Sequence, residues 1–243
     1  MDAMIFAAGL GTRLGPIGQS TPKALIEIAG RTMLERTAAR LVAAGVTRIV
    51  VNAHHYADLI ERFIAGHDFG AEVLVSREPE RPLETGGGLL HARALFRRDD
   101  IILLHNVDVI GSASLQPLAT VQRSGDAVAT LAVNQRETAR YLLFDDRGLF
   151  GREDRRHGLR REVRAPRGAV RTLAFAGIHA CSPRLLDLIS ERGVFSIMDA
   201  YLRLAADGHV IAPWLLEDDH WLEIGNLQRL EAARARLERA APA

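Results

Sequence analysis

Short apolar runs alternate with amphipathic segments through roughly the first 130 residues, and this alternation restricts the fold more than any other feature of the sequence. We expect strands at residues 4–8, 48–52, 72–76, 100–104 and 127–133, and helices at residues 33–44, 56–65, 89–96 and 115–123. Strands that alternate with helices of about ten residues form βαβ units, in which helices cover both faces of a parallel sheet. The sequence therefore predicts an α/β fold with a Rossmann-like, mostly parallel central sheet and helices on both faces.

The pattern changes after residue 135. We expect a hairpin at residues 141–152, an arginine-rich excursion at residues 152–171 and a strand at residues 172–180. Further helices are expected at residues 185–189, 197–206 and about 226–240, with a short strand at residues 221–224. The C-terminal third is therefore predicted to be irregular, within a single domain that spans residues 1–243.

The composition disfavours several classes of function. A net charge of +1 and an aromatic content of 5% give no support to nucleic-acid binding. No apolar run approaches the roughly 18 residues of a membrane span, and the first residues enter a strand rather than a targeting segment. Cys181 is the single cysteine, which excludes an internal disulfide, and we expect it to be a buried structural thiol. We therefore expect a cytoplasmic protein that binds neither membrane nor nucleic acid.

The loop after the first predicted strand is suited to holding a polyphosphate. Gly9 and Gly11 let the backbone approach a ligand closely, and successive N–H groups in such a loop form an anion-binding nest. Arg13 offers a planar fork for phosphate oxygens, and Lys23 offers a compact point charge. The alternative is a tight turn in which both cations are simply solvated.

Two common phosphate-binding motifs do not match this loop. The P-loop needs a lysine directly after a glycine, and the dinucleotide fingerprint needs a third glycine where Leu14 stands. The fuller string, G-x-G-T-R-L from Gly9 and T-P-K-A-L from Thr21, is much more specific. It resembles the signature of the sugar-1-phosphate nucleotidylyltransferases.

This resemblance implies a nucleotidyltransferase fold, similar to the GT-A fold, with a nucleotide-binding part at about residues 1–135 and a sugar-binding part at about 136–243. It implies that Gly11, Thr12 and Arg13 cradle the β- and γ-phosphates of an NTP, and that Lys23 neutralises the α-phosphate. The nucleotide-binding residues implied for this region are Ala8, Gly9, Gly11, Thr12, Arg13 and Lys23.

A second glycine-rich stretch, Pro82 to Gly88, is expected as a loop between a strand and a helix. Three consecutive glycines carry no side chains, so a flat group can lie on the backbone, and the helix N-terminus that follows adds positive potential. The resemblance implies that this loop encloses the nucleotide base, with Thr85, Gly86 and Gly87 binding the nucleotide. A flexible loop without a ligand is the alternative.

Asp108 follows an apolar strand and is expected in the crevice beyond the strand's carboxyl end. Magnesium prefers hard oxygen ligands and usually binds one or two carboxylates together with substrate phosphates. The resembled family has its main metal ligand here, so Asp108 is the strongest catalytic candidate; a turn carboxylate is the alternative. The resemblance also places Asn106 near the sugar phosphate, whereas His105 is expected to pack at the edge of the core.

The stretch from Trp221 to Asn226 resembles the closing motif of the family, W-x-D-x-G-T, whose aspartate is the second metal ligand. Glu223 stands in its place, a departure that adds one methylene to the side chain. The resemblance also matches Gly177 to a glycine that lies against the sugar. The usual E-K-P motif has no clear match, so no cation is assigned to the acceptor phosphate, and the arginine-rich excursion is read as a solvated hairpin.

The reaction implied by the resemblance is attack of a sugar 1-phosphate oxygen on the α-phosphorus of an NTP, with pyrophosphate leaving and Mg²⁺ as cofactor. The E-T-G-G-G loop and the compact length are most similar to N-acetylmuramate 1-phosphate uridylyltransferases, which favours UTP. A guanylyl- or cytidylyltransferase acting on another sugar or alcohol phosphate is an alternative, as is a nucleotide-sensing homologue with weak catalysis. We expect a monomer or a small homo-oligomer.

Overall fold

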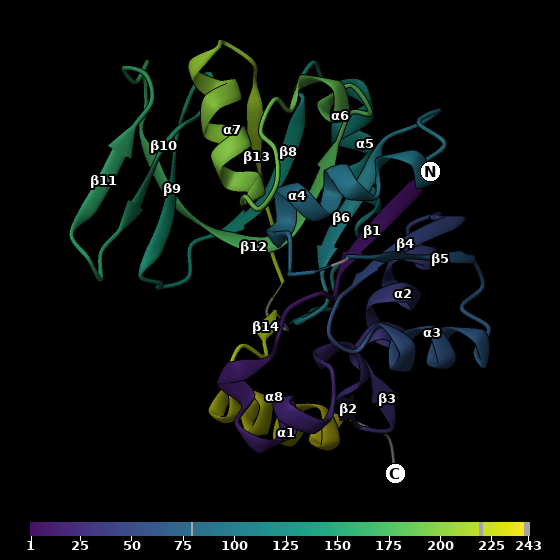
Figure 1. The fold of residues 1–243 in the computed structure, drawn as a ribbon. Coiled ribbons are helices and arrows are strands. Elements are labelled where there is room, and N and C mark those ends of the chain that lie inside the picture. The colour runs from purple at the N-terminus through teal and green to yellow at the C-terminus, as the bar shows by residue number, and fades with distance from the viewer. Residues whose placement is uncertain (79, 219–220, 241–243) are drawn as a thin grey trace.

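The computed structural model describes residues 1–78, 80–218 and 221–240, and its centre is a ten-stranded sheet (Figure 1). The strands are β1 (Asp2–Phe6), β4 (Arg48–Ala53), β5 (Glu72–Arg77), β6 (Ile102–Asn106), β8 (Ala129–Asn134), β9 (Arg140–Asp145), β10 (Gly148–Asp154), β11 (Leu159–Glu162), β12 (Arg171–Cys181) and β13 (Ile211–Leu215). Their order is β11-β10-β9-β12-β6-β1-β4-β5, with β8 also paired to β12 and β13 paired to β8.

The centre of the sheet is parallel, as the alternating pattern predicts. β1 pairs in parallel with β4 on one side and with β6 on the other, and β4 pairs in parallel with β5. In this register Phe6 lies opposite both Asn52 and Asn106, so the carboxyl ends of three strands meet at one edge of the sheet. This edge is the place where an open α/β sheet binds its ligands.

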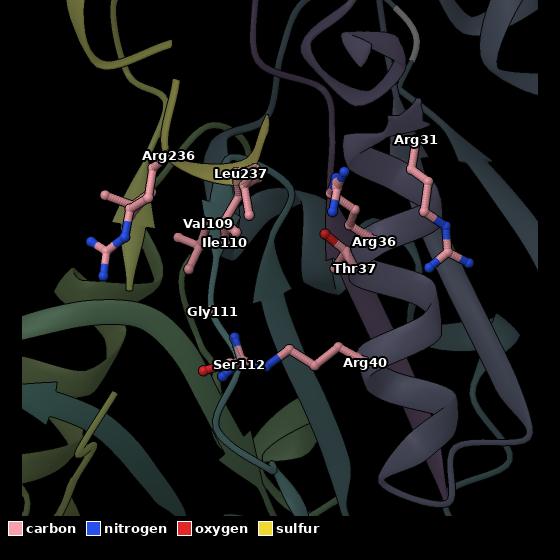
Figure 2. A pocket seen from close by; sticks show the side chains of 11 residues that line it. Arg31, Arg36, Thr37, Arg40, Val109, Ile110, Gly111, Ser112, Arg236 and Leu237 are labelled. Carbon is pink, nitrogen blue, oxygen red and sulfur yellow. The ribbon is translucent and has the colours of Figure 1, made fainter. Parts of the chain in front are cut away.

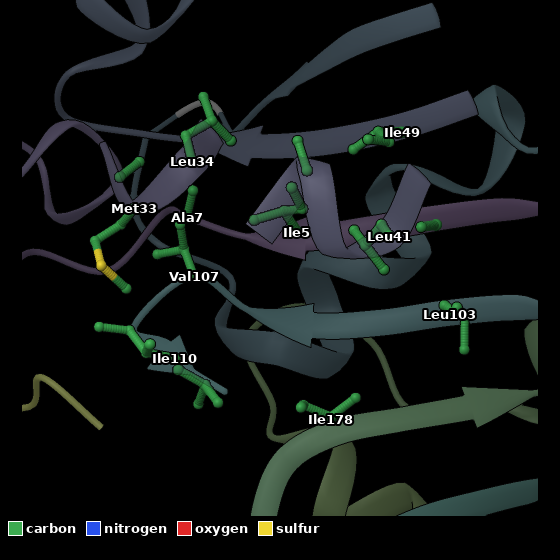
Figure 3. Close-up of a cluster of buried hydrophobic side chains, with 14 of the residues drawn as sticks. Ile5, Ala7, Met33, Leu34, Leu41, Ile49, Leu103, Val107, Ile110 and Ile178 are labelled. Atoms are coloured by element: carbon green, nitrogen blue, oxygen red, sulfur yellow. The ribbon is translucent and has the colours of Figure 1, made fainter. Parts of the chain in front are cut away.

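Helices cover both faces of the sheet. The cluster of buried apolar side chains on one face includes residues of α2 (Met33–Ala43), α3 (Ala57–Ala65) and α5 (Gln116–Ser124). The cluster on the other face includes residues of α4 (Glu84–His91), α6 (Leu185–Leu188) and α7 (Ile197–Ala206). Figure 3 shows part of the first cluster, where Leu34 and Leu41 of α2 pack over Ile5 and Ile49 of the sheet.

Local sequence explains why α2 begins where it does. Thr32 Oγ1 accepts a hydrogen bond from the Glu35 backbone N–H at 3.2 Å, and Glu35 Oε2 accepts one from the Thr32 N–H at 2.7 Å. This capping box satisfies two backbone donors that a helix start would otherwise leave unpaired. The apolar residues Met33, Leu34 and Leu41 then fall on the face of the helix that is buried against the sheet.

Two short ribbons and two helices lie beyond the carboxyl edge of the sheet. β2 (Glu27–Ile28) pairs with β3 (Arg31–Thr32), and β7 (Val109–Ile110) pairs with β14 (Leu222–Glu223). The C-terminal helix α8 (Leu227–Ala240) packs against β14 and β2, and α1 (Pro16–Ser20) packs against the short 3₁₀ turn at Thr12–Leu14. Within the described residues, none of the helices combines the length and the apolar character that crossing a membrane would require.

The C-terminal third contributes antiparallel strands to the same sheet. The predicted hairpin is confirmed as β9 and β10, and the arginine-rich excursion adds the exposed strand β11. β13 is not predicted, because Pro213 interrupts its sequence pattern; proline is tolerated there because β13 pairs only with β8 and so lies at an edge. Cys181 is buried in β12, as expected, and burial raises the pKa of its thiol to about 12.

One prediction about the second glycine-rich stretch is wrong. Helix α4 begins at Glu84, so Gly86 and Gly87 lie inside the helix rather than in a loop before it. A Cβ atom built on Gly86 would lie 2.2 Å from the Phe195 ring, and one built on Gly87 would lie 2.3 Å from the Gly193 carbonyl oxygen. The glycines are therefore needed because α4 packs closely against residues 193–195, a contact between distant segments that local sequence does not reveal.

Candidate active site

A cavity of about 250 Å³ lies at the carboxyl ends of β1, β4 and β6. Six of the residues predicted to bind substrates or metal line it: Ala8, Gly9, Lys23, Thr85, Asn106 and Asp108. Segments separated by as many as 100 residues in the sequence therefore meet around one cavity, because each of them follows a strand or helix that ends at this edge. Gly11, Thr12, Arg13, Gly86, Gly87, Gly177 and Glu223 are not part of its lining.

Lys23 and Asp108 form an ion pair in this cavity. Lys23 Nζ donates a hydrogen bond to Asp108 Oδ2 at 2.8 Å, and the two side chains are only 12% and 16% exposed. The resemblance implies that Lys23 neutralises the α-phosphate and that Asp108 is the main metal ligand, and the structure brings these two side chains into direct contact. An ion pair so little exposed is screened less than a surface pair, so it is a strong local electrostatic feature.

The glycine-rich loop folds back on itself after β1. Gly11 adopts a left-handed conformation with a φ of 66°, and it begins a short 3₁₀ turn over Thr12–Leu14 whose Leu14 side chain is buried. Gly18 of α1 packs directly on this turn, since a Cβ atom there would lie 2.2 Å from the Gly11 carbonyl oxygen. Thr12 and Arg13 are exposed at the outer side of the loop, where a ligand can reach them.

A buried polar network connects this loop to the start of α4. Asn52 Oδ1 accepts a hydrogen bond from the Ala7 backbone N–H at 2.7 Å, and Asn52 Nδ2 donates one to Glu78 Oε1 at 2.7 Å. Glu78 Oε2 accepts a further bond from the Leu83 N–H at 2.7 Å. Both side chains are almost fully buried, so the network fixes the two walls of the cavity relative to one another.

Asn52 lines the cavity, yet the sequence analysis did not select it. The signal was present, because Asn52 is a polar residue at the end of an apolar parallel strand, the same position that singled out Asp108. Glu84 also lines the cavity and has a φ of 59°, a conformation that non-glycine residues seldom adopt.

The backbone N–H groups of Gly86 and Gly87 already have partners. Both donate to the Phe195 carbonyl oxygen, at 3.0 and 3.3 Å, and Thr85 Oγ1 accepts from the Ile197 N–H at 3.0 Å. A nucleotide base therefore cannot use these two N–H groups without displacing Phe195. Thr85 remains at the cavity wall, so it is the member of this stretch that is best placed for a ligand.

The β7–β14 ribbon carries Glu223 on β14 and follows directly after Asp108, which lies in the turn before β7. Glu223 lies opposite Val109 in the ribbon, and the Ile224 N–H donates to the Asp108 carbonyl oxygen at 2.9 Å. The Glu223 carboxylate accepts a hydrogen bond from Arg229 at 2.7 Å. The Arg13 side chain is nearby, because a Cβ atom built on Gly225 would lie 2.9 Å from Glu223 Oε1 and 3.7 Å from Arg13 Nη2.

The oxygen donors fit a magnesium ion that takes its remaining ligands from a substrate. In the described part of the chain, there is no group of three or more histidine, cysteine, aspartate or glutamate side chains that could hold a metal ion by themselves. Two carboxylates are a number that Mg²⁺ commonly uses when phosphates supply the rest of its ligands. Asp108 is at the cavity, whereas Glu223 is held by Arg229 and would have to change partner to join it.

Gly177 lies against Asn106. β12 changes register between Phe175 and His179, and Gly177 has a φ of 77° within this irregularity. A Cβ atom there would lie 3.2 Å from Asn106 Nδ2 and 2.8 Å from Val109. The glycine therefore lets β12 approach the residues around Asp108.

Arg136 is a candidate acceptor-side cation that the sequence analysis did not identify. Its guanidinium lies 4.0 Å from the centroid of the Trp221 ring and donates to the Asn134 side chain at 2.7 Å and to the Phe175 carbonyl at 2.8 Å. Burial lowers the pKa of Arg136, and the Glu223 carboxylate raises it. The available signal was its position just after the carboxyl end of β8.

Known proteins with similar sequences or folds are consistent with this geometry. Residues 3–205 match the family described as "MobA-like NTP transferase domain". The chain is 36% identical over 250 residues to the N-acetylmuramate alpha-1-phosphate uridylyltransferase of Caulobacter vibrioides. This alignment covers 98% of this chain and 97% of that protein. It is 27% identical to the mannose-1-phosphate guanyltransferase of Neurospora crassa, covering 93% of this chain and 61% of that longer protein.

The fold also matches a solved structure of low sequence similarity. The UDP-glucose pyrophosphorylase of Acinetobacter baumannii aligns with a TM-score of 0.77 at 19% sequence identity. The match covers 99% of this chain and 94% of that one. The whole described architecture, including the antiparallel C-terminal strands, is therefore shared with that protein.

Proposed function

Because this chain belongs to the MobA-like NTP transferase domain family and is a sugar-1-phosphate nucleotidyltransferase, we propose that it transfers a uridylyl group from UTP to N-acetylmuramate 1-phosphate. The products are the UDP-sugar and pyrophosphate. The full-length relationship to the Caulobacter uridylyltransferase supports both substrates. The observation that carries the proposal for the site is the Lys23–Asp108 ion pair beside the glycine-rich loop.

The ion pair suggests how the cavity receives a triphosphate. The triphosphate as a whole carries more negative charge than one carboxylate, so Lys23 moves from Asp108 to the α-phosphate when the nucleotide binds. This exchange frees the Asp108 carboxylate at the moment when the phosphate arrives. Arg13 and the backbone of Gly11 and Thr12 hold the β- and γ-phosphates, which leave as pyrophosphate.

The chemical step is one in-line displacement. An oxygen of the sugar 1-phosphate forms a bond to the α-phosphorus, and the bond between the α-phosphorus and the bridging oxygen of the β-phosphate breaks. The chain contributes positioning and charge neutralisation through Lys23, Arg13 and Arg136, and no covalent enzyme intermediate is needed. We propose that Asp108 and Glu223 hold Mg²⁺, which when bound neutralises charge on the α-phosphate.

A pyrophosphate-release screen tests this proposal. Purified protein with Mg²⁺ is combined with UTP, GTP, CTP, ATP or dTTP and with N-acetylmuramate, mannose, glucose or glucosamine 1-phosphates. We expect the highest kcat/KM for UTP with N-acetylmuramate 1-phosphate, and loss of release when EDTA removes the divalent cation. Folded protein that releases pyrophosphate with none of these pairs would contradict the assignment.

A guanylyltransferase is the second candidate, because the Neurospora relative acts with a guanyl group on mannose 1-phosphate. In that case GTP with mannose 1-phosphate would give the highest kcat/KM in the same screen. The identity of 27% is lower than that of the uridylyltransferase relative, and the chain spans only 61% of the guanyltransferase. We therefore favour the uridylyl reaction.

A further inference from the structure

A second cavity, of about 270 Å³, lies between α2, the β7–β14 ribbon and α8. It shares no lining residue with the active-site cavity. Figure 2 shows its lining, with Arg40 extending from α2 toward Ser112, and with Val109 and Ile110 beside Leu237. The proposed reaction gives this cavity no role.

The lining of this second cavity is strongly cationic. It includes four arginines, Arg31, Arg36, Arg40 and Arg236, and among the residues the structure describes no aspartate or glutamate takes part in it. Burial lowers the pKa of both Arg36 and Arg40. The positive charge of Arg31 lowers the pKa of Arg36 further, whereas Glu35 raises the pKa of Arg36 and Asp218 raises that of Arg40. Bringing like charges together costs free energy unless an anion compensates them.

Several polar atoms of this lining are buried without a hydrogen-bond partner. They are Thr37 Oγ1, Arg36 Nε and Arg40 Nη1, each of which has no partner among the described residues. Thr37 is only 2% exposed, and it lines the cavity. Buried polar groups are rarely left unpaired in folded proteins, so three of them around one cavity indicate that something else satisfies them.

Arg40 is held so that one nitrogen remains available. Its Nε and Nη2 donate to the Ala113 carbonyl oxygen at 3.1 and 2.8 Å, and Nη2 lies 3.4 Å from the buried Asp218 carboxylate. Asp218 is itself bound by the Ser112 and Ala113 N–H groups, both at 2.9 Å. A Cβ atom on Gly111 would lie 2.8 Å from Arg40 Nη1, so the glycine leaves room beside that nitrogen.

We propose that this second cavity binds a small organic phosphate, with the phosphate on Thr37, Arg36 and Arg40 and the organic part on the apolar wall. Guanidinium groups match phosphate oxygens in geometry and charge, and Thr37 adds a hydroxyl donor. Val109, Ile110 and Leu222 supply the apolar wall. The volume of about 270 Å³ is near the lower limit of ordinary ligand sites.

The position of the cavity makes it a regulatory site for the proposed reaction. Its apolar wall is formed by β7 and β14, the ribbon that directly follows Asp108 and carries Glu223. A ligand that orders this ribbon changes how the two carboxylates are held, so binding at the second cavity is coupled to turnover. This part of the inference rests on the proposed function, whereas the binding itself does not.

Isothermal titration with phenyl phosphate and with inorganic phosphate tests the binding, in the absence of nucleotide and sugar phosphate. We expect T37V and R36Q each to weaken phenyl phosphate binding about tenfold, because each removes a hydrogen bond to a charged ligand. T37V should melt at the same temperature as the wild type or higher, since it removes an unpaired hydroxyl. The control R62Q, which removes an exposed arginine of α3, should bind like the wild type.

Phenyl phosphate should also bind more tightly than inorganic phosphate, because only the former uses the apolar wall. Equal affinities would overturn the assignment of an ester and indicate inorganic phosphate instead. If K23M abolishes binding and T37V and R36Q leave it unchanged, the phosphate lies in the active site and the proposal is wrong.

The coupling is tested by pyrophosphate release at increasing phenyl phosphate. We expect the wild-type rate to change with the half-maximal effect near the titrated Kd, and the T37V rate to respond only at about tenfold higher concentration. Binding in the titration with no change in rate would overturn the regulatory role. A competitive pattern against UTP that persists in T37V would assign the effect to the active site.

Discussion

The sequence contains many arginines but only one lysine, Lys23. Its ammonium group is compact, and it fits beside Asp108 at 12% exposure. A guanidinium is larger and has a fixed planar geometry, so it is a poor replacement in this position. The use of lysine at this position is therefore consistent with a point charge that moves between a carboxylate and a phosphate.

The single lysine also allows a direct test of nucleotide binding. An amine-selective acylating reagent can modify only Lys23 and the N-terminal amine, and peptide mass mapping separates the two. We expect UTP to protect Lys23 from acylation and to leave the N-terminal amine unaffected. Equal acylation of Lys23 with and without saturating UTP would contradict its contact with the α-phosphate.

Replacement of Asp108 by asparagine tests the proposed metal ligand. D108N keeps the size of the side chain and loses its charge, so we expect kcat to fall by about 10²–10³. The melting temperature should fall modestly, because D108N leaves Lys23 without its ion-pair partner, and the variant should remain folded because Asp108 lines a cavity rather than the core. D99N, at an exposed turn, is the matched control and should retain full activity; a comparable loss in D99N would remove the support for a specific role.

At the scale of elements, the fit of α4 against residues 193–195 decides the shape of one cavity wall. G87A would place a methyl group 2.3 Å from the Gly193 carbonyl oxygen, a backbone atom that cannot move aside alone. We expect a loss of about 1–3 kcal/mol in the free energy of unfolding, from overpacking, and a raised KM for the NTP.

The control for this substitution is G66A, at the end of α3. A methyl group there meets its nearest neighbours at 3.7 and 3.8 Å, which are ordinary contact distances. Urea denaturation of the two variants provides the measurement, and G66A should unfold within about 0.5 kcal/mol of the wild type. If G87A proves as stable as G66A, α4 is not held as tightly as the structure indicates.

The same elements show what the sequence alone can predict. α2 and the parallel strands follow from local patterns, namely a capping box and short apolar runs, and Asp108 follows from its place after a strand. The helical start of α4 cannot be predicted from local sequence. Its Gly86 is needed because the helix packs closely against Phe195, which lies more than 100 residues away in the sequence. Arg136 was missed for the same reason, since its partners Trp221 and Phe175 belong to distant segments.

At the scale of the whole molecule, two buried histidines make stability depend on pH. Burial lowers the pKa of His105 and of His179 to about 3, so the folded protein keeps both rings neutral. The unfolded chain takes up these protons near pH 6.5, so it binds more protons than the folded one below that value. Their contribution to stability is therefore fully present above about pH 6.5 and is lost progressively as the pH falls toward 3.

Chemical denaturation between pH 8 and pH 4 measures this effect. Each histidine should remove up to about 1.4 kcal/mol of unfolding free energy per pH unit below its unfolded pKa. H179Q should reduce by about half the slope of unfolding free energy against pH, even if it also changes the unfolding free energy at pH 8. H55Q, which replaces an exposed histidine, should leave that slope unchanged. A wild-type unfolding free energy that stays constant from pH 7 to pH 4.5 would contradict burial of the two neutral rings.

The long strand β12 joins the antiparallel C-terminal strands to the parallel centre of the sheet, because it pairs with β9, β6 and β8. A chain cut after residue 135 would lose this strand. The apolar strand β6 would then lie at an edge of the sheet, with unpaired backbone N–H and C=O groups. Such an exposed edge recruits other strands and leads to aggregation. We therefore expect residues 1–135 not to fold as a separate module, so a change of acceptor specificity would have to be engineered in place, by altering side chains around the crevice rather than by exchanging halves between relatives.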